Sequence, residues 1–241
     1  MSDSTQRDWN AEWQKLDITI NKGIWLLTER IKLQYLLPLI PKNGKLLEVG
    51  CGSAKLSVLL AQKGCRVVGI DRSIEALRLA RANCTWLAVP GVFAVADAFQ
   101  LPFLDGSFDV VFSTGLLEHF RNPVPVVMEM TRVLRNGGVF FSDVVPLKFS
   151  LIRLNFYLHG LYRQASDEYP YRSNDIYNWL RQSGLQNIRV FSSGVLPPLG
   201  LLGRLPLVAT LSLRYPKFWT LLDGTFLSDW LGFFYLAFAV K

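Results

Sequence analysis

One segment, Leu46 to Ser57, constrains the fold of this 241-residue chain more than any other. A short apolar run that contains Glu48 ends in the sequence Gly50-Cys51-Gly52, and leucines at helical spacing follow. Glycine tolerates the backbone angles of such a turn and lets a ligand approach the backbone closely. The helix after the turn begins with free N–H groups, which favour an anionic group. The segment therefore predicts the cofactor-binding turn of a doubly wound α/β domain.

Two further acidic residues indicate the kind of cofactor. Asp71 ends the next apolar run, about 20 residues beyond Gly50, which is the spacing of an acid that binds ribose hydroxyls. Asp97 ends a third apolar run. A dinucleotide site has a third glycine where this chain has Lys55, and no G-K-S/T sequence comes after the turn for a P-loop. The pattern therefore weakens the interpretation as a dehydrogenase and does not fit a P-loop.

Five short motifs resemble, in order and spacing, those of the class I S-adenosylmethionine-dependent methyltransferases. The resemblance is to the broad group that acts on small molecules and lipids, of the methyltransferase type 11 kind. It covers roughly residues 45–145, and it departs from the family at Ala54, where many members have a third glycine. The matching segments are Glu48–Ser53, Gly69–Asp71, Ala96–Ala98 with Leu101–Phe103, Phe108–Phe112 with Leu116–His119, and Arg132–Gly138.

The resemblance implies a Rossmann-like seven-stranded sheet of order 3-2-1-4-5-7-6 with strand 7 antiparallel. We interpret residues 1–241 as one methyltransferase domain. Its predicted parts are a helical cap (1–44), a cofactor-binding core (45–145), a helical substrate cap (146–186) and C-terminal strands (187–241) with an apolar insertion at 194–222. Apolar residues from Trp9 and Trp13 to Leu27 recur at steps of three and four, which predicts an amphipathic helix. In the family such helices lie over the cofactor.

The resemblance also implies S-adenosylmethionine as the cofactor and gives roles to the motif residues. Gly50 and Gly52 form a bed for its methionine half, Asp71 binds the ribose, Asp97 faces the adenine amino group, and the N–H of Ala98 meets the adenine ring. The whole predicted cofactor-binding set is Glu48, Gly50, Cys51, Gly52, Asp71, Arg72, Asp97, Ala98 and Ser113.

Three of the candidate roles have a simpler alternative. Glu48 fixes the loop or the cofactor's amino group, or it only bonds local N–H groups. Arg72 covers the adenosine, or it is a solvated surface residue. His119, one of two histidines, is the candidate catalytic residue that accepts a proton from a hydroxyl acceptor. The alternative is a histidine that bonds the loop framing the pocket.

The residues after the fourth predicted strand disfavour some reactions. Superfamily members that methylate amino groups of bases or of glutamine carry an Asn/Asp-Pro-Pro-Tyr run there, whereas this chain reads Ser113-Thr114-Gly115-Leu116. A metal-dependent site would need a cluster of acids, and the sequence has none at this place, so no metal is predicted.

Composition limits the partners and the compartment. The net charge of +7 permits an anionic membrane surface or nucleic acid. The charges are dispersed and no RNA-binding module is readable, so no nucleic-acid partner is expected. Three cysteines without metal-like spacing indicate reduced thiols in the cytoplasm. The polar N-terminus lacks the features of a signal peptide, and no apolar run reaches the ~18 residues of a membrane span.

Two apolar segments suggest where the acceptor comes from. Residues 147–165 carry a leucine stripe with interleaved Lys148 and Arg153, as in a helix at a membrane interface, and residues 194–222 are rich in leucine and proline. The first hypothesis is O- or C-methylation of a small hydrophobic or lipid-linked acceptor, by a protein peripheral to the inner face of the membrane. The alternatives are a soluble sugar or small-molecule O-methyltransferase with an apolar lid, and a non-catalytic cofactor-binding scaffold. The oligomeric state is not predicted.

Overall fold

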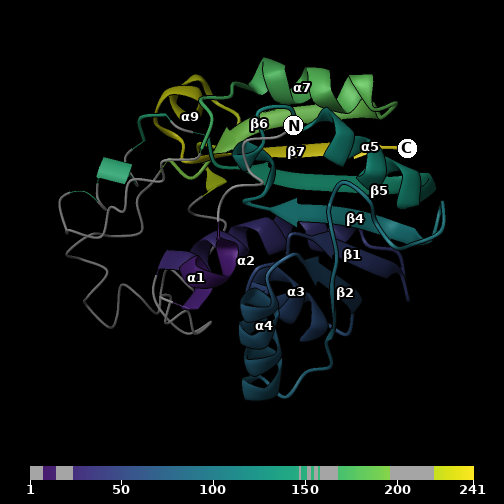
Figure 1. Ribbon diagram of the computed structural model, residues 1–241. Helices are drawn as coiled ribbons and strands as arrows, with labels where there is room; N and C mark the ends of the chain where they lie inside the picture. The colour runs from purple at the N-terminus through teal and green to yellow at the C-terminus, as the bar shows by residue number, and fades with distance from the viewer. Residues whose placement is uncertain are drawn as a thin grey trace.

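The computed structural model describes residues 8–14, 24–146, 148–150, 153–154, 157, 168–195 and 220–241. These residues contain a seven-stranded sheet of order β3-β2-β1-β4-β5-β7-β6, which confirms the predicted order (Figure 1). Residues 196–219, most of the predicted apolar insertion, lie outside the described residues. The strands are β1 (Lys45–Val49), β2 (Arg66–Asp71), β3 (Val92–Val95), β4 (Phe108–Thr114), β5 (Leu134–Val144), β6 (Gln186–Ser193) and β7 (Phe234–Val240).

The direction of the strands determines where a ligand can bind. Strands β1 to β5 pair in parallel, and β7 runs antiparallel to both β5 and β6, as predicted. The carboxyl ends of the five parallel strands therefore meet at one edge of the sheet. Ligands of open α/β sheets bind at this edge, near the point where the strand order reverses. Here the order reverses between β1 and β4.

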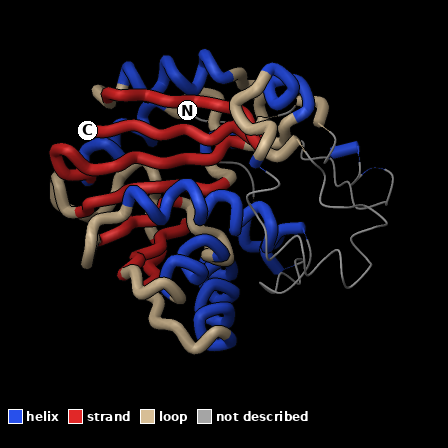
Figure 2. The backbone as a smooth tube through the Cα atoms, turned by 180° about the vertical axis from the view of Figure 1, so that it is seen from behind, coloured by secondary structure: helices blue, strands red, loops and turns tan. Residues whose placement is uncertain are grey.

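Helices cover both faces of the sheet (Figures 1 and 2). Side chains of α2 (Ile24–Leu36) and α3 (Lys55–Ala61) pack on one face, and those of α5 (Val124–Val133) and α7 (Ser173–Gln182) pack on the other. Helix α4 (Ile74–Trp86) lies beside α3 and β3. The remaining described elements are α1 (Trp9–Gln14), α9 (Phe226–Leu231) and two 3-10 turns, η2 (Leu37–Leu39) and η3 (Leu117–His119).

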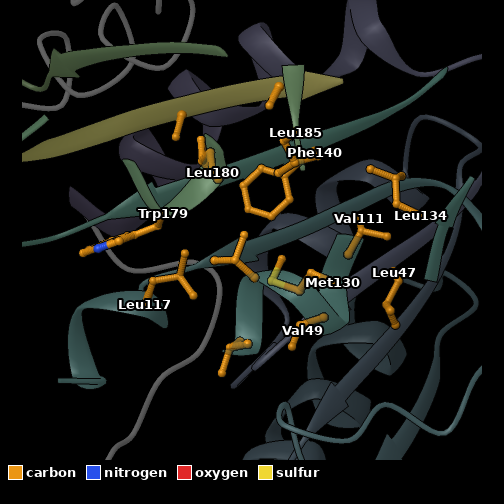
Figure 3. Close-up of a cluster of buried hydrophobic side chains, with 14 of the residues drawn as sticks. Leu47, Val49, Val111, Leu117, Met130, Leu134, Phe140, Trp179, Leu180 and Leu185 are labelled. Carbon is orange, nitrogen blue, oxygen red and sulfur yellow. The ribbon is translucent and has the colours of Figure 1, made fainter. Parts of the chain in front are cut away.

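The central strands are apolar on both sides because both faces are buried. On β4, Val110 and Phe112 belong to the cluster under α2 and α3, whereas Val111 belongs to the cluster under α5 and α7. Figure 3 shows the second cluster, in which Phe140 of β5 lies near Leu180 of α7. Strands that are covered on both faces read as continuous hydrophobic runs. This explains why the strands of the core were readable from the sequence.

The ends of the chain differ from the simplest interpretation of their sequence. The amphipathic pattern that begins at Trp9 is described as two helices, α1 and α2, with residues 15–23 outside the described part. The apolar run from Leu231 to Val240 becomes a strand only at Phe234. Helix α9 precedes it and ends at Gly232, where a side chain would collide with Ser192. Apolar composition alone does not separate this helix from the strand.

A buried cluster of charges attaches α2 to the sheet. The Lys32 ammonium lies 2.9 Å from a carboxylate oxygen of Glu29 and 3.0 Å from one of Asp143, and all three side chains are buried. Burial alone would lower the pKa of Lys32, but Asp143 and Glu29 outweigh it and raise that pKa. Burial raises the pKa of Asp143 to about 6, and Lys32 opposes this rise. The positive charge of Lys32 therefore offsets the free-energy cost of burying two carboxylates.

We expect Lys32→Met to lower the free energy of unfolding by about 3–5 kcal/mol at pH 7, because it leaves buried carboxylates without a cation. The folded-state pKa of Asp143 lies above its ordinary value of 3.8, so lowering the pH through about 6 favours the folded state. The deficit should therefore shrink between pH 7 and pH 5. Urea unfolding at both pH values measures this, with the exposed Lys63→Met as control. A loss below about 1 kcal/mol would contradict the role of Lys32.

Candidate functional site

A cavity of about 280 Å³ lies at the carboxyl edge of the sheet, on both sides of the point where the strand order reverses. Its walls come from the loops after β1, β2, β3 and β4, from η3 and from α1. The lining residues are Trp9, Trp13, Gly50, Cys51, Gly52, Ile70, Asp71, Arg72, Ala96, Asp97, Ala98, Phe99, Thr114, Gly115, Leu116, His119 and Phe120. Seven of the nine predicted cofactor-binding residues are among them, and so is His119.

The loop after β1 is the glycine turn that the sequence predicted. Gly50 and Gly52 have φ angles of +64° and +52°, which side chains rarely tolerate. A Cβ at Gly50 would lie 2.6 Å from Leu116, and one at Gly52 would lie 2.7 Å from the Trp13 ring. Ala54, the departure from the family pattern, also has a positive φ of +56° and immediately precedes α3. The turn therefore keeps its shape although alanine replaces the third glycine.

Asp71, at the end of β2, holds this loop in place. Its carboxylate accepts hydrogen bonds from the backbone N–H of Gly52, at 2.8 Å, and of Ser73, at 2.9 Å. Burial raises the pKa of Asp71, and the two N–H groups oppose that rise because they stabilise the charged form. One acid thus joins the glycine turn to the loop after the neighbouring strand, as well as lining the cavity.

Asp97, Ala98 and Arg72 lie on the wall formed by the loops after β2 and β3. Asp97 is exposed and accepts a hydrogen bond of 2.9 Å from the backbone N–H of Phe99. Ala98 and Phe99 are half-buried beside it, and the Phe99 ring meets Phe120 edge-on at 5.2 Å. A planar ring held here has apolar side chains on one side and a carboxylate at its edge.

Two predicted cofactor-binding residues do not line the cavity. Glu48 is fully buried beneath the floor and accepts hydrogen bonds from the hydroxyls of Ser57 and Thr114, the latter at 3.0 Å. Burial raises the pKa of Glu48 to about 8. Its contact with the cavity runs through Thr114, which does line it. Ser113 is also fully buried, with its hydroxyl 3.0 Å from that of Ser142.

His119 ends η3 and lines the cavity. Its ring packs edge-on against Trp9, with centroids 5.0 Å apart. The preceding residue, Glu118, is buried, and its carboxylate accepts a hydrogen bond from the backbone N–H of Val145. Its backbone carbonyl accepts another from Tyr169, so the loop with His119 is held from two directions.

Buried acids lie behind this side of the cavity. Burial and then the charge of Asp143 raise the pKa of Glu118 well above its usual range. A Cβ at Gly115 would lie only 3.6 Å from a Glu118 carboxylate oxygen, so the acid is close beneath the floor. Tyr171 donates a hydrogen bond of 2.6 Å to the carbonyl of Phe120. It therefore supports the loop that carries His119.

Sequence reasoning missed several wall residues. Trp9 and Trp13 were predicted to lie on a helix over the cofactor but were not named as site residues, and both line the cavity. Two tryptophans four residues apart in a polar N-terminal stretch were the available signal. Thr114 and Phe120 follow β4 and also line the cavity, and nothing distinguishes them in the sequence from ordinary loop residues. Within the described ranges, no group of three or more His, Cys, Asp or Glu side chains could hold a metal ion.

Comparison with known proteins agrees with this architecture. Residues 47–142 match the family model described as a methyltransferase domain. A ubiquinone biosynthesis O-methyltransferase of Pseudomonas aeruginosa (strain UCBPP-PA14) is 30% identical over 59% of this chain, and the match spans 64% of that protein's length. The protein of the same name from Ralstonia nicotianae is 31% identical over 65% of this chain and 69% of its own length.

A solved structure extends the likeness to almost the whole chain. The S-adenosylmethionine-dependent methyltransferase structure from Thermotoga maritima has a TM-score of 0.61 at 19% identity, over 90% of this chain and 93% of its own. At that identity the likeness shows the fold alone. Together with the Ralstonia relative and the matched domain, it completes the assignment: the chain belongs to the class I S-adenosylmethionine-dependent methyltransferases.

Proposed function

We propose that this chain transfers a methyl group from S-adenosylmethionine to an oxygen of a small, hydrophobic or lipid-linked acceptor. The observation that carries the proposal is one cavity that joins the glycine turn, the two strand-end acids Asp71 and Asp97, and His119. Relatives at 30–31% identity are ubiquinone biosynthesis O-methyltransferases, and this supports an oxygen atom on a hydrophobic acceptor.

The cofactor fits the residues that are present. Gly50 and Gly52 line a cavity of about 280 Å³, and neither could carry a Cβ, because Leu116 and Trp13 lie within 2.7 Å of the position it would take. Asp71 lies where a ribose would be held, and Asp97 with Ala98 and Phe99 forms a wall for an adenine ring. The cofactor supplies an activated methyl group on a positively charged sulfur. The chain has mainly to align the acceptor with it, and alignment can lower a barrier by as much as ~7–11 kcal/mol.

His119 is the residue proposed to take the acceptor's proton. It is the histidine on the cavity wall, and it lies on η3, shortly after Gly115 and Leu116, which also line the cavity. Histidine exchanges protons near neutral pH. Trp9 on one side and the loop anchored through Glu118 on the other hold the ring in position. In the alternative interpretation, the same contacts make His119 a purely structural residue.

Exposed apolar side chains support contact with a membrane surface. Around α9, Phe226 is 74% and Trp230 is 67% exposed, and Phe149 and Tyr157 of the predicted substrate cap are 60% and 70% exposed. We propose that the exposed residues Phe149, Leu154, Tyr157, Leu221, Phe226, Leu227 and Trp230 form one surface, here called the α9 patch. Exposed patches of this kind mark interaction surfaces. Trp, Tyr and Phe suit the boundary between lipid and water.

The basic residues of the same segment make contacts within the protein. Lys148 donates hydrogen bonds to Ser192 and to the carbonyl of Asp229, and Arg153 pairs with Glu168 and contacts the carbonyl of Pro146. Two of the interleaved basic residues are therefore engaged within the protein, whereas residues 158–167 lie outside the described residues. We propose apolar insertion as the main source of membrane affinity. Within the described residues, no helix is long and apolar enough to cross a bilayer.

Transfer of labelled methyl into a host extract, split into membrane, soluble and RNA fractions, tests the function directly. We expect label in the organic-extractable membrane fraction, and at least a tenfold loss of label with Asp71→Ala, because Asp71 both lines the site and orders the Gly52 loop. Asp97→Ala, which removes an exposed carboxylate, should also lower cofactor affinity without unfolding the chain. Glu75→Gln on α4 is the matched control.

The other outcomes choose among the alternatives. Label confined to the soluble fraction would indicate a soluble sugar or small-molecule acceptor. Cofactor binding without any transfer would indicate a scaffold, and label in RNA would contradict the proposed acceptor class.

Replacing His119 by Asn should lower kcat by ~10²–10⁴-fold if the imidazole accepts the proton. Cofactor affinity, measured by calorimetry, should stay within threefold of the wild type, because the cofactor half of the cavity is intact. The rate of the wild type should rise with pH as the imidazole loses its proton, and the variant should lack that rise. A change in kcat of less than about threefold would leave His119 with a structural role only.

The double variant Phe226→Ser/Trp230→Ser should weaken binding to lipid vesicles in a flotation assay at least tenfold. Because Lys148 and Arg153 are engaged within the protein, neutral phosphatidylcholine vesicles should bind the wild type nearly as well as anionic vesicles do. Leu104→Ser, at an 83% exposed position in the loop before β4, is the control. Binding that requires anionic lipid, or that survives in the double variant, would argue against the α9 patch.

A further inference from the structure

Helix α1 places two tryptophan rings against the cofactor cavity. Trp9 and Trp13 are four residues apart and therefore lie on one side of the helix. The helix has no buried residue of its own, and a hydrogen bond of 2.7 Å from the Ser73 hydroxyl to Asn10 ties it to the loop after β2. The main contribution of the helix is therefore the pair of tryptophan rings on the cavity wall.

The two rings mark the ends of one stretch of wall. Two atoms of the Trp13 ring lie 2.7 Å from the position that a Cβ of Gly52 would take, so this ring covers the glycine turn. The Trp9 ring contacts His119 at 5.0 Å, at the acceptor side. In the proposed function, the methionine half of the cofactor lies on the glycine turn and the acceptor lies near His119. The charged sulfur that links the two lies between these rings.

The acids of the cavity lie on other parts of its wall than the two aromatic rings. The acids on the wall are Asp71 and Asp97. Asp71 accepts two backbone N–H bonds on the ribose side, and Asp97 lies at the adenine side. A sulfonium group carries a positive charge but has no hydrogen on its sulfur, so electron-rich groups attract it through its charge and not through a hydrogen bond from the sulfur. The electron-rich face of a tryptophan ring attracts a cation without any hydrogen bond.

We infer that Trp9 and Trp13 recognise the positive charge of the cofactor and thereby distinguish S-adenosylmethionine from its demethylated product. The inference rests on the proposed function. In the transfer, the acceptor oxygen forms a bond to the methyl carbon as the bond from carbon to sulfur breaks. The bonding electrons stay on the sulfur, and the oxygen's proton passes to a base. The sulfur becomes a neutral thioether, and the attraction to the rings is lost.

The consequence is a cavity that holds the charged cofactor more tightly than the neutral product. Cation–π attraction of about one to two kcal/mol at a partly desolvated site corresponds to about a tenfold difference in affinity. The product would therefore leave more readily than the cofactor. The rings also cover the glycine turn, and this part of their contact acts on both molecules alike.

Calorimetric titration of the purified chain with S-adenosylmethionine and with S-adenosylhomocysteine tests the inference without any acceptor. Trp9→Leu/Trp13→Leu should weaken binding of the charged cofactor about tenfold more than binding of the neutral product. Trp9→Phe/Trp13→Phe, which keeps aromatic faces, should restore most of the preference. Phe99→Leu, on the adenine wall, is the matched control and should weaken both ligands by the same factor.

Each outcome separates this inference from the proposed function. A wild type that binds neither ligand would overturn the proposed function and this inference with it. A wild type that binds both, with the leucine variant weakened equally for both, would overturn only the recognition of charge by the rings. Circular dichroism of the leucine and phenylalanine variants should match the wild type, since neither ring is part of the buried core.

Discussion

The carboxylate of Asp71 accepts hydrogen bonds from the N–H groups of Gly52 and Ser73, and so joins the loops after two neighbouring parallel strands. These bonds add to two backbone bonds of the turn, from the Cys51 N–H to Ile70 and from the Ala54 N–H to Cys51. Together they hold φ angles of +64° and +52°, which glycine permits. The turn determines the position of the Trp13 ring above it, and Ser73 holds α1 through Asn10. Asp71 thus orders the glycine turn directly, and through Ser73 it also helps to hold helix α1 over the cavity.

The acids beneath the floor differ from Asp71 because they lack comparable donors. Glu48 has only two hydroxyl partners and full burial, and its pKa rises to about 8, so it is mostly protonated at neutral pH. Burial likewise favours the protonated form of Glu118 by raising its pKa. Asp143 can keep its charge because Lys32 lies 3.0 Å away. The acids beneath the floor serve to position Thr114 and the loop with His119, whereas Asp71 and Asp97 lie on the cavity wall itself.

The parts that the sequence predicted are those fixed by local rules. A buried parallel strand must be apolar on both sides, a turn at positive φ needs glycine, and an acid at a strand end lies at the ligand edge. These rules located the strands, Gly50, Gly52, Asp71 and Asp97. Ser113 was placed at the site by its position in the chain, but strand alternation turns its side chain toward Ser142. The walls from Trp9, Trp13 and Phe120 depend on contacts between distant segments, and no local pattern encodes them.

A cavity that binds a cation and releases a neutral product has to limit how strongly it stabilises the charge. A carboxylate beside the sulfonium would bind the cofactor tightly, but that attraction would fade as the charge is neutralised in the transition state, and such ground-state binding does not raise the rate. Aromatic rings attract a cation more weakly and also exclude water. Two features agree with this requirement: backbone N–H groups engage Asp71, and two tryptophan rings lie on the cavity wall. In this arrangement the chain attracts the positive charge only weakly, so that the attraction does not oppose its loss during the transfer.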